Sequence, residues 1–258
     1  MRVKAMLLDL EGVLYEGERP IEGATTAVAR LHDLGLDLRY LTNTTTRSRA
    51  GVAERLAGLG LKLGAETLFT PLAAARRLLM DWGAQRIRLA APQEAAPDFA
   101  GLELVESGPV DAVVVGDLHK AFDWDLLNEL FGLQRGGARL VALHKNRYCR
   151  REGGIGLDVG PFVAALEYAA NTEAVVVGKP SPEFFQLALD DMGVAAGETV
   201  MVGDDIDADI GGAQSAGLTA VQVRTGKYTE SDLEHPSFRP DMRIDSVAAL
   251  PDLLREMI

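Results

Sequence analysis

The chain has 258 residues, of which 47% are hydrophobic and 25% charged, as in an ordinary globular protein long enough for two moderate domains. Its net charge of −12 disfavours nucleic acid and anionic membranes as partners, because both recruit basic surfaces. The only cysteine, Cys149, excludes an intrachain disulfide, and acids at residues 9 and 11 interrupt the first apolar run. We therefore expect a cytoplasmic protein with neither a signal peptide nor a membrane span.

Strand-like and helix-like segments alternate along almost the whole chain, which predicts a mainly parallel α/β sheet. The expected strands are residues 3–9, 36–41, 86–91, 112–115, 139–143, 174–177, 199–202 and 219–223. The expected helices cover residues 27–34, 52–59, 71–82, 124–135, 161–171, 182–192 and 207–216. Since no low-complexity linker interrupts this pattern, a second domain must be an insertion joined by short hinges, near residues 81–84 and 171–173.

Polar residues follow four of these strands directly. They are Asp9 with Glu11, Thr42 with Asn43, Lys179, and the acids of residues 204–209. A buried strand that stops on an acid places it at the carboxyl edge of the sheet, where open α/β folds bind ligands. Each segment also has an ordinary reading, because acids fill polar loops and Thr and Asn cap helices. The functional reading rests on all four together.

The fourth segment points to a metal ion. Asp204, Asp205, Asp207 and Asp209 put four carboxylates into six residues, more than helix capping requires. Crowded carboxylates repel one another unless a hard cation lies among them, and Mg²⁺ prefers one or two carboxylates with water and phosphate oxygens. Lys179 at another strand end could neutralise a phosphate and a neighbouring carboxylate. The residues thus indicate a Mg²⁺ site for a small phosphorylated molecule.

The four segments together resemble the motifs of the haloacid dehalogenase (HAD) superfamily. They read Asp9-Leu10-Glu11-Gly12-Val13, Thr42-Asn43, Lys179-Pro180 and Gly203-Asp204-Asp205 with Asp209, in that superfamily's order. The long insertion between the second and third motifs looks like the large α/β cap of the NagD-like (type IIA) branch. Within that branch, residues 144–148, 160–168 and 225–228 look most like the subgroup of phospholysine phosphohistidine inorganic pyrophosphate phosphatase.

The resemblance implies a fold and a reaction. The fold is a Rossmann-like three-layer core with a parallel sheet, formed by residues 1–80 and 175–258, plus an inserted α/β cap at residues 81–174. The reaction is Mg²⁺-dependent hydrolysis of a phosphate ester, phosphoramidate or pyrophosphate through an aspartyl-phosphate on Asp9. The implied metal ligands are Asp9, Asp204 and the backbone carbonyl of Glu11. Thr42, Asn43 and Lys179 would bind phosphate oxygens, and Asp205 and Asp209 would orient Lys179 or the water ligands of the metal.

Glu11 departs from the family pattern, which generally has a second aspartate there to protonate the leaving group and then activate water. Glutamate moves the carboxyl by roughly one C–C bond, ~1.5 Å, and a misplacement of about 1 Å can cost ~10²-fold in rate. We therefore expect a slow or narrowly selective phosphatase. A phosphotransferase of the same fold and a catalytically weak phosphate-binding regulatory protein stay as alternatives. The physiological substrate and the oligomeric state stay open, with the cap as the surface through which a homodimer would form.

Overall fold

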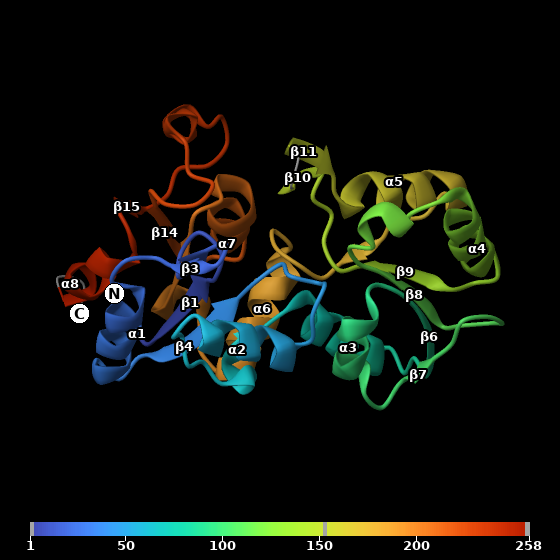
Figure 1. Ribbon diagram of the computed structural model, residues 1–258, viewed down its shortest axis with the longest axis horizontal. Coiled ribbons are helices and arrows are strands. Elements are labelled where there is room, and N and C mark those ends of the chain that lie inside the picture. The colour runs from blue at the N-terminus through green and yellow to red at the C-terminus, as the bar shows by residue number, and fades with distance from the viewer. Residues whose placement is uncertain (1–2, 152–153, 256–258) are drawn as a thin grey trace. The chain divides into compact units, whose positions relative to one another are not determined.

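The computed structural model describes residues 3–151 and 154–255 (Figure 1). Their internal contacts divide the chain into two compact units. The first contains the residues up to Thr42, then Val52–Phe69 and the chain from Lys179 onward. The second contains Asn43–Gly51 and Thr70–Gly178. Both units are therefore discontinuous in sequence, and the chain passes from one to the other four times.

The second unit begins earlier in the chain than residue 81, where the sequence analysis placed the boundary, and ends at residue 178 instead of 174. Helix α3 (Pro71–Asp81) groups with it, since Arg76 on this helix donates a hydrogen bond to the carbonyl of Ala100 at 2.9 Å. The segment Asn43–Gly51 groups with it as well. An apolar stripe identifies such a helix in the sequence but does not say which sheet the helix covers.

The first unit is built on a six-stranded, fully parallel sheet in the order β15-β14-β13-β1-β4-β5. Its strands are β1 (Ala5–Asp9), β4 (Asp37–Leu41), β5 (Leu68–Phe69), β13 (Thr199–Gly203), β14 (Thr219–Val223) and β15 (Met242–Ile244). Its helices are α1 (Ala24–Asp33), α2 (Arg49–Gly58, shared with the second unit), α6 (Pro182–Met192), the π-helical segment η5 (Ile206–Gly211), α7 (Gly212–Ser215) and α8 (Leu250–Arg255). A small hairpin, β2 (Tyr15–Glu16) and β3 (Arg19–Pro20), follows β1.

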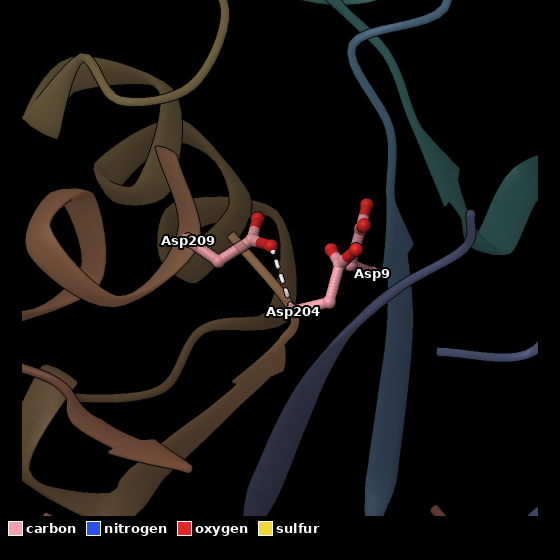
Figure 2. Close-up of side chains that lie close together, drawn as sticks. All are labelled: Asp9, Asp204 and Asp209. Carbon is pink, nitrogen blue, oxygen red and sulfur yellow. Dashed lines mark hydrogen bonds between the residues drawn. The ribbon is translucent and has the colours of Figure 1, made fainter. Parts of the chain in front are cut away.

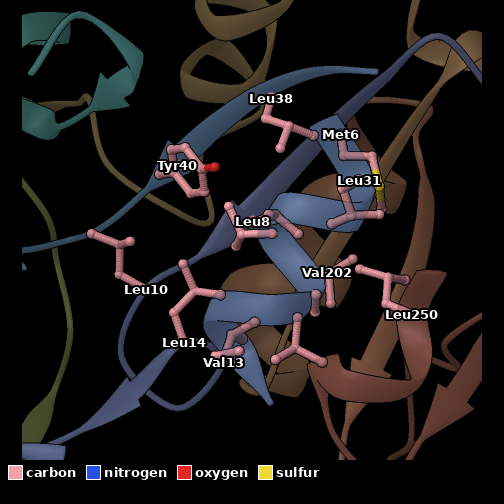
Figure 3. Packing of buried hydrophobic residues seen from close by; sticks show 14 of the residues in the cluster. Met6, Leu8, Leu10, Val13, Leu14, Leu31, Leu38, Tyr40, Val202 and Leu250 are labelled. Carbon is pink, nitrogen blue, oxygen red and sulfur yellow. The ribbon is translucent and has the colours of Figure 1, made fainter. Parts of the chain in front are cut away.

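Both faces of this sheet are covered by helices. Successive strand residues point to opposite faces, so Met6 and Leu8 of β1 face one side and pack with Leu31 of α1 and Leu250 of α8 (Figure 3). On the other face, Phe184 of α6 meets Phe69 at the end of β5, with the ring centroids 5.0 Å apart. All five residues of β1 are buried, and the strand lies between β13 and β4, so β1 is an inner strand whose carboxyl end lies at the edge of the sheet.

The second unit has its own parallel sheet of five strands in the order β12-β9-β8-β6-β7. These strands are β6 (Arg86–Ala90), β7 (Glu103–Leu104), β8 (Ala112–Val115), β9 (Arg139–Ala142) and β12 (Val175–Val176). Helices α4 (Trp124–Arg135) and α5 (Val159–Ala170) cover one face with Leu130 and Val163 in a separate apolar cluster, and an antiparallel hairpin joins β10 (Tyr148–Arg151) to β11 (Gly154–Leu157).

The predicted fold class, a Rossmann-like α/β core with a parallel sheet and a further α/β unit, is confirmed. Each expected strand and helix has a counterpart, although the helix expected at residues 207–216 is π-helical over its first turn and a half. The sequence analysis did not predict β2, β3, β5, β7, β10, β11, β15 or α8, which are short. Across residues 3–151 and 154–255, no helix has both the length and the apolar character needed to cross a membrane.

Candidate active site

Asp9 is the last residue of β1, at the carboxyl edge of the six-stranded sheet. On one side Leu8 pairs with Val202 of β13, and on the other Asp9 itself pairs with Leu41 of β4. Along the chain, β4 and β5 are added on one side of β1, and β13, β14 and β15 are then added on its other side. The order of the strands therefore reverses between β1 and β13. Open α/β sheets bind ligands at such a reversal. Asp9 therefore ends its strand where the fold favours a binding site.

Three buried carboxylates gather at this edge (Figure 2). Asp9 follows β1, Asp204 follows β13 directly, and Asp209 lies on η5. Their side chains offer oxygen atoms that all lie within 4.8 Å of one another, and the three residues are only 1–6% exposed. The sequence analysis expected all three here, and the structure brings them together from positions up to 200 residues apart.

Lys179 supplies the positive charge of the cluster. Its Nζ lies 2.5 Å from Oδ1 of Asp9 and 2.6 Å from Oδ1 of Asp209, and its side chain is 4% exposed. Burial opposes the charge of the ammonium group, yet Asp209 and Asp9 hold its pKa above the ordinary lysine value. Lys179 thus stays protonated beside Asp9, within a cluster of three acids.

Burial and the charges of neighbouring acids raise the pKa values of two of these acids. Burial, only partly offset by Lys179, raises the pKa of Asp9 from 3.8 to about 6. Burial together with the charges of Asp9 and Asp209 raises the pKa of Asp204 from 3.8 to about 8. Without a further cation the protein therefore resists ionising these groups. A donor set made only of oxygens, buried and short of positive charge, fits a hard divalent cation such as Mg²⁺.

The loop after β13 is fixed by its own hydrogen bonds. Oδ2 of Asp209 accepts the N–H groups of Asp204 and Asp205, each at 3.1 Å. Oδ1 of Asp205 accepts the N–H groups of Asp207 at 3.0 Å and Ala208 at 2.9 Å, and so caps η5. Although burial opposes its charge, Asp205 has a pKa below the ordinary value because Lys227 lies beside it. Asp205 and Asp209 therefore hold the backbone from which Asp204 projects.

A fourth loop joins this site, and the sequence analysis left its role open. Residues Thr225–Lys227 follow β14. The hydroxyl of Thr225 donates to the carbonyl of Gly12 at 2.5 Å, and the N–H of Lys227 donates to Oδ2 of Asp204 at 2.6 Å. The Nζ of Lys227 lies 2.9 Å from Oδ2 of Asp205. A Thr-Gly-Lys sequence at the end of a core strand was the available signal, but its neighbours were not apparent from the pattern alone.

Glu11 lies outside the buried carboxylate cluster. Glu11 is exposed, and its Oε1 accepts a hydrogen bond from the N–H of Gly17 at 3.1 Å. The phenol of Tyr15 is close to the same carboxylate, since burial first and Glu11 second raise the pKa of Tyr15. Arg55 in turn donates to the Tyr15 hydroxyl at 3.5 Å and to the carbonyl of Gly17 at 2.9 Å. The Glu11 side chain is thus held by the turn that follows β1, an arrangement the sequence analysis did not anticipate.

The two residues predicted to bind phosphate after β4 fall on either side of a unit boundary. Thr42 is buried in the first unit, one residue beyond the Asp9–Leu41 pair, and its N–H donates to the carbonyl of Phe69 at 3.2 Å. It stands at the same sheet edge as Asp9. Asn43 begins the second unit. Phosphate binding by Thr42 and Asn43 stays a prediction.

The fold and the site define a Rossmann-like α/β protein with a buried carboxylate cluster at a strand-order reversal, and family models identify its class. The model described as haloacid dehalogenase-like hydrolase matches residues 6–102, and the one described as HAD-hydrolase-like matches residues 176–250. Curated relatives match almost the full chain. Haloacid dehalogenase-like hydrolase domain-containing protein 2 of Rattus norvegicus is 42% identical over 95% of this chain and 93% of its own. Phospholysine phosphohistidine inorganic pyrophosphate phosphatase of Xenopus laevis is 41% identical over 98% and 94%.

Solved structures agree with these relatives. The p-nitrophenyl phosphatase from Archaeoglobus fulgidus superposes with a TM-score of 0.91 at 27% identity, covering 98% of this chain and 100% of that one. NagD from E. coli K-12 superposes with a TM-score of 0.86 at 26% identity, covering 96% and 98%. A glycerol phosphate phosphatase from Mycobacterium tuberculosis, solved with magnesium, has a TM-score of 0.84 at 30% identity, covering 96% and 76%. The chain belongs to the haloacid dehalogenase-like hydrolase family, in its NagD-like branch.

Proposed function

We propose that this protein is a Mg²⁺-dependent phosphatase that hydrolyses a small phosphate ester, phosphoramidate or pyrophosphate through an aspartyl-phosphate on Asp9. The observation that carries the proposal is the buried arrangement of Lys179 between Asp9 and Asp209, with Asp204 alongside, at the carboxyl edge of the sheet. Relatives and structural neighbours named as phosphatases support the same enzyme class.

Asp9 is the nucleophile in this proposal. One of its carboxylate oxygens attacks phosphorus, the bond to the leaving-group oxygen or nitrogen breaks, and an acyl phosphate forms on Asp9. Water then attacks the same phosphorus, which releases inorganic phosphate and restores the carboxylate. Lys179 orients Asp9 through the 2.5 Å hydrogen bond and offsets negative charge on the transferring group, so catalysis relies on positioning and electrostatics.

Asp9, Asp204 and the backbone carbonyl of Glu11 would hold Mg²⁺. A bound Mg²⁺ would polarise a phosphoryl oxygen and offset the charge that develops on it. The chemistry of the site favours this assignment, because the donor set is all oxygen and burial, together with the charges of neighbouring acids, raises the pKa values of Asp9 and Asp204. The magnesium in the solved glycerol phosphate phosphatase structure is further support.

Other groups contribute through the substrate. Thr42 and the backbone of Asn43 would bind phosphate oxygens together with Lys179. Glu11 would protonate the leaving group and later activate water, for which its carboxyl must leave the N–H of Gly17. The second unit would act as a cap that admits substrate and excludes bulk water. A cytoplasmic location and a homodimer formed through the cap stay predictions.

The placement of Glu11 favours one alternative. If the carboxylate of Glu11 stays on the N–H of Gly17, the acid–base step lacks its proposed catalyst and turnover is weak. The protein would then be a regulatory binder of phosphate compounds. Transfer of the phosphoryl group to an acceptor other than water is the remaining alternative, and added alcohols would reveal it as alkyl phosphate.

The test is release of phosphate from para-nitrophenyl phosphate with Mg²⁺ and with a chelator, for the wild type and for Asp9→Asn. We expect turnover that requires Mg²⁺ and disappears in the variant. Folded wild type that binds Mg²⁺ but gives no turnover with any phosphate ester, phosphoramidate or pyrophosphate would support the regulatory alternative. Turnover that survives Asp9→Asn would contradict the proposed nucleophile.

A further inference from the structure

We propose that residues Thr225–Lys227, here called the β14 clamp, position Asp204 for the metal by tying the loop after β13 to the loop after β1. The inference rests on the proposed function, since it assigns these residues a role in binding the Mg²⁺ ion. The β14 clamp supplies no metal ligand and does not touch the reacting atoms; its three residues are positioning residues. These residues follow β14, whereas the two loops that carry the proposed metal ligands follow β1 and β13.

The first line of evidence is the set of hydrogen bonds that the clamp makes. On the side of β1, the Thr225 hydroxyl donates to the Gly12 carbonyl at 2.5 Å, and the Gly226 N–H donates to Oε1 of Glu16 on β2 at 2.6 Å. Its bonds to the β13 loop are from Lys227, through its N–H to Oδ2 of Asp204 at 2.6 Å and through Nζ to Oδ2 of Asp205 at 2.9 Å. The clamp therefore bridges the two loops that carry the three proposed metal ligands.

The second line of evidence is the lack of space around one oxygen of Asp204. A Cβ placed on Gly12 would lie 2.1 Å from Oδ2 of Asp204, and a Cβ placed on Gly226 would also lie 2.1 Å from it. Both glycines have positive φ, +87° and +66°, which other residues rarely adopt. Two backbones thus enclose Oδ2 while the N–H of Lys227 bonds to it, and the carboxylate cannot rotate freely.

A carboxylate with one oxygen fixed in this way presents the other oxygen in a defined direction. Outer partners of metal ligands act in this manner, and their loss typically costs about 10–100-fold in metal affinity or activity. The clamp also contacts Asp205 through Nζ of Lys227, and the Asp205 carboxylate caps η5, the segment that carries Asp209. Disturbing the clamp should weaken metal binding without removing any ligand.

The variant Gly226→Ala tests the contact with Asp204, and the chain offers a matched control. Gly193 has the same φ of +66°, but a Cβ there meets nothing within 4 Å. Gly193→Ala therefore introduces the same backbone strain without the clash. A second pair compares hydrogen bonds: Thr225→Val removes the bond to Gly12, whereas Thr67→Val removes an equivalent bond from a Thr hydroxyl to the Gly64 carbonyl, 2.8 Å long.

The measurement is the Mg²⁺ concentration equal to Kd, obtained by fitting the rise in Tm to a stabilisation of RT ln(1 + [Mg²⁺]/Kd), with the metal alone and no substrate. We expect this concentration to rise about 10–100-fold for Gly226→Ala and by a smaller factor for Thr225→Val, with both controls unchanged. The Mg²⁺ dependence of para-nitrophenyl phosphate turnover should shift in parallel. If Gly226→Ala does not fold, the valine pair decides the question.

The outcomes separate the clamp from the proposed function. A wild type whose Tm does not respond to Mg²⁺ contradicts the metal site itself, and with it the proposed function. A wild type that responds, with Gly226→Ala and Thr225→Val shifted no more than Gly193→Ala and Thr67→Val, overturns the clamp and leaves the proposed function standing.

Discussion

Replacing Asp204 with asparagine is expected to stabilise the metal-free protein while abolishing its activity. Asp204 is 2% exposed, and burial with the charges of Asp9 and Asp209 raises its pKa from 3.8 to about 8. Between these values the folded state keeps a proton that the unfolded state has released, so stability falls as pH rises, by about 1.4 kcal/mol per pH unit. At pH 7 the accumulated cost is of the order of 4 kcal/mol.

Asparagine avoids this cost, because it is neutral at every pH and its Oδ1 can still accept the N–H of Lys227. Thermal unfolding in a chelator between pH 4 and pH 8 provides the assay. The Tm values of wild type and Asp204→Asn should nearly coincide near pH 4 and diverge as pH rises, with the variant roughly 10 °C higher at pH 7. Added Mg²⁺ should raise the Tm of the wild type and leave that of the variant unchanged.

Asp205→Asn is the matched control. Its pKa lies below the ordinary value, since Lys227 and the Ala208 N–H outweigh burial. The charge of Asp205 thus contributes stability that is present above the unfolded pKa and lost as pH falls, so Asp205→Asn should lower the Tm at pH 7. An Asp204→Asn protein that is no more stable than wild type at pH 7 without metal would refute the reasoning.

Three further predictions concern neighbouring parts of the structure. Lys179→Met leaves Asp9 and Asp209 buried without their cation, so we expect stability to fall by about 3–5 kcal/mol and phosphate release to become undetectable; substantial remaining activity would argue against its role. Glu11→Asp should speed breakdown of the phosphoenzyme in single-turnover experiments. An unchanged rate would mean either that Glu11 already activates water efficiently or that this step needs no carboxylate at position 11. Phe184→Ala removes a fully buried ring that packs on Phe69, so urea unfolding should show a loss of about 3–5 kcal/mol while the Mg²⁺ concentration dependence stays as in wild type.

Much of the fold was predictable because its strands are buried and its helices amphipathic. The segment Ala5–Asp9 is apolar until its last residue, and Pro182–Met192 starts with a proline and ends at Gly193, as helices commonly do. The unit to which Pro71–Asp81 belongs was not predictable, since the stripe on this helix is the same whichever sheet it covers. The hairpin of β10 and β11 was not predicted either. Ile155 and Leu157 of β11 are exposed, so this strand lacks the buried apolar face by which a strand is usually recognised.

The site was predictable where strand ends carry the chemistry. Asp9 ends β1 and Asp204 follows β13, and these neighbouring parallel strands end at one edge of the same sheet, so the proximity of the two acids follows from the topology. Lys179 instead follows β12 of the second unit's sheet, so strand order alone did not predict its hydrogen bond to Asp9. The orientation of Glu11 was not predictable, because it depends on the turn to Gly17 and on Tyr15. The contact of Lys227 with Asp204 was likewise hidden, since a backbone N–H donor leaves no mark in the residue type.

The most direct test of the central claim is chemical trapping of the aspartyl-phosphate. The protein is mixed with Mg²⁺ and para-nitrophenyl phosphate, quenched in acid and reduced with borohydride, which converts an acyl phosphate to an alcohol. Peptide mass spectrometry should then find homoserine at position 9, and Asp9→Asn should give none. A protein that releases phosphate rapidly yet yields no homoserine at position 9, or yields it at another acid, would contradict the assignment of Asp9 as the nucleophile.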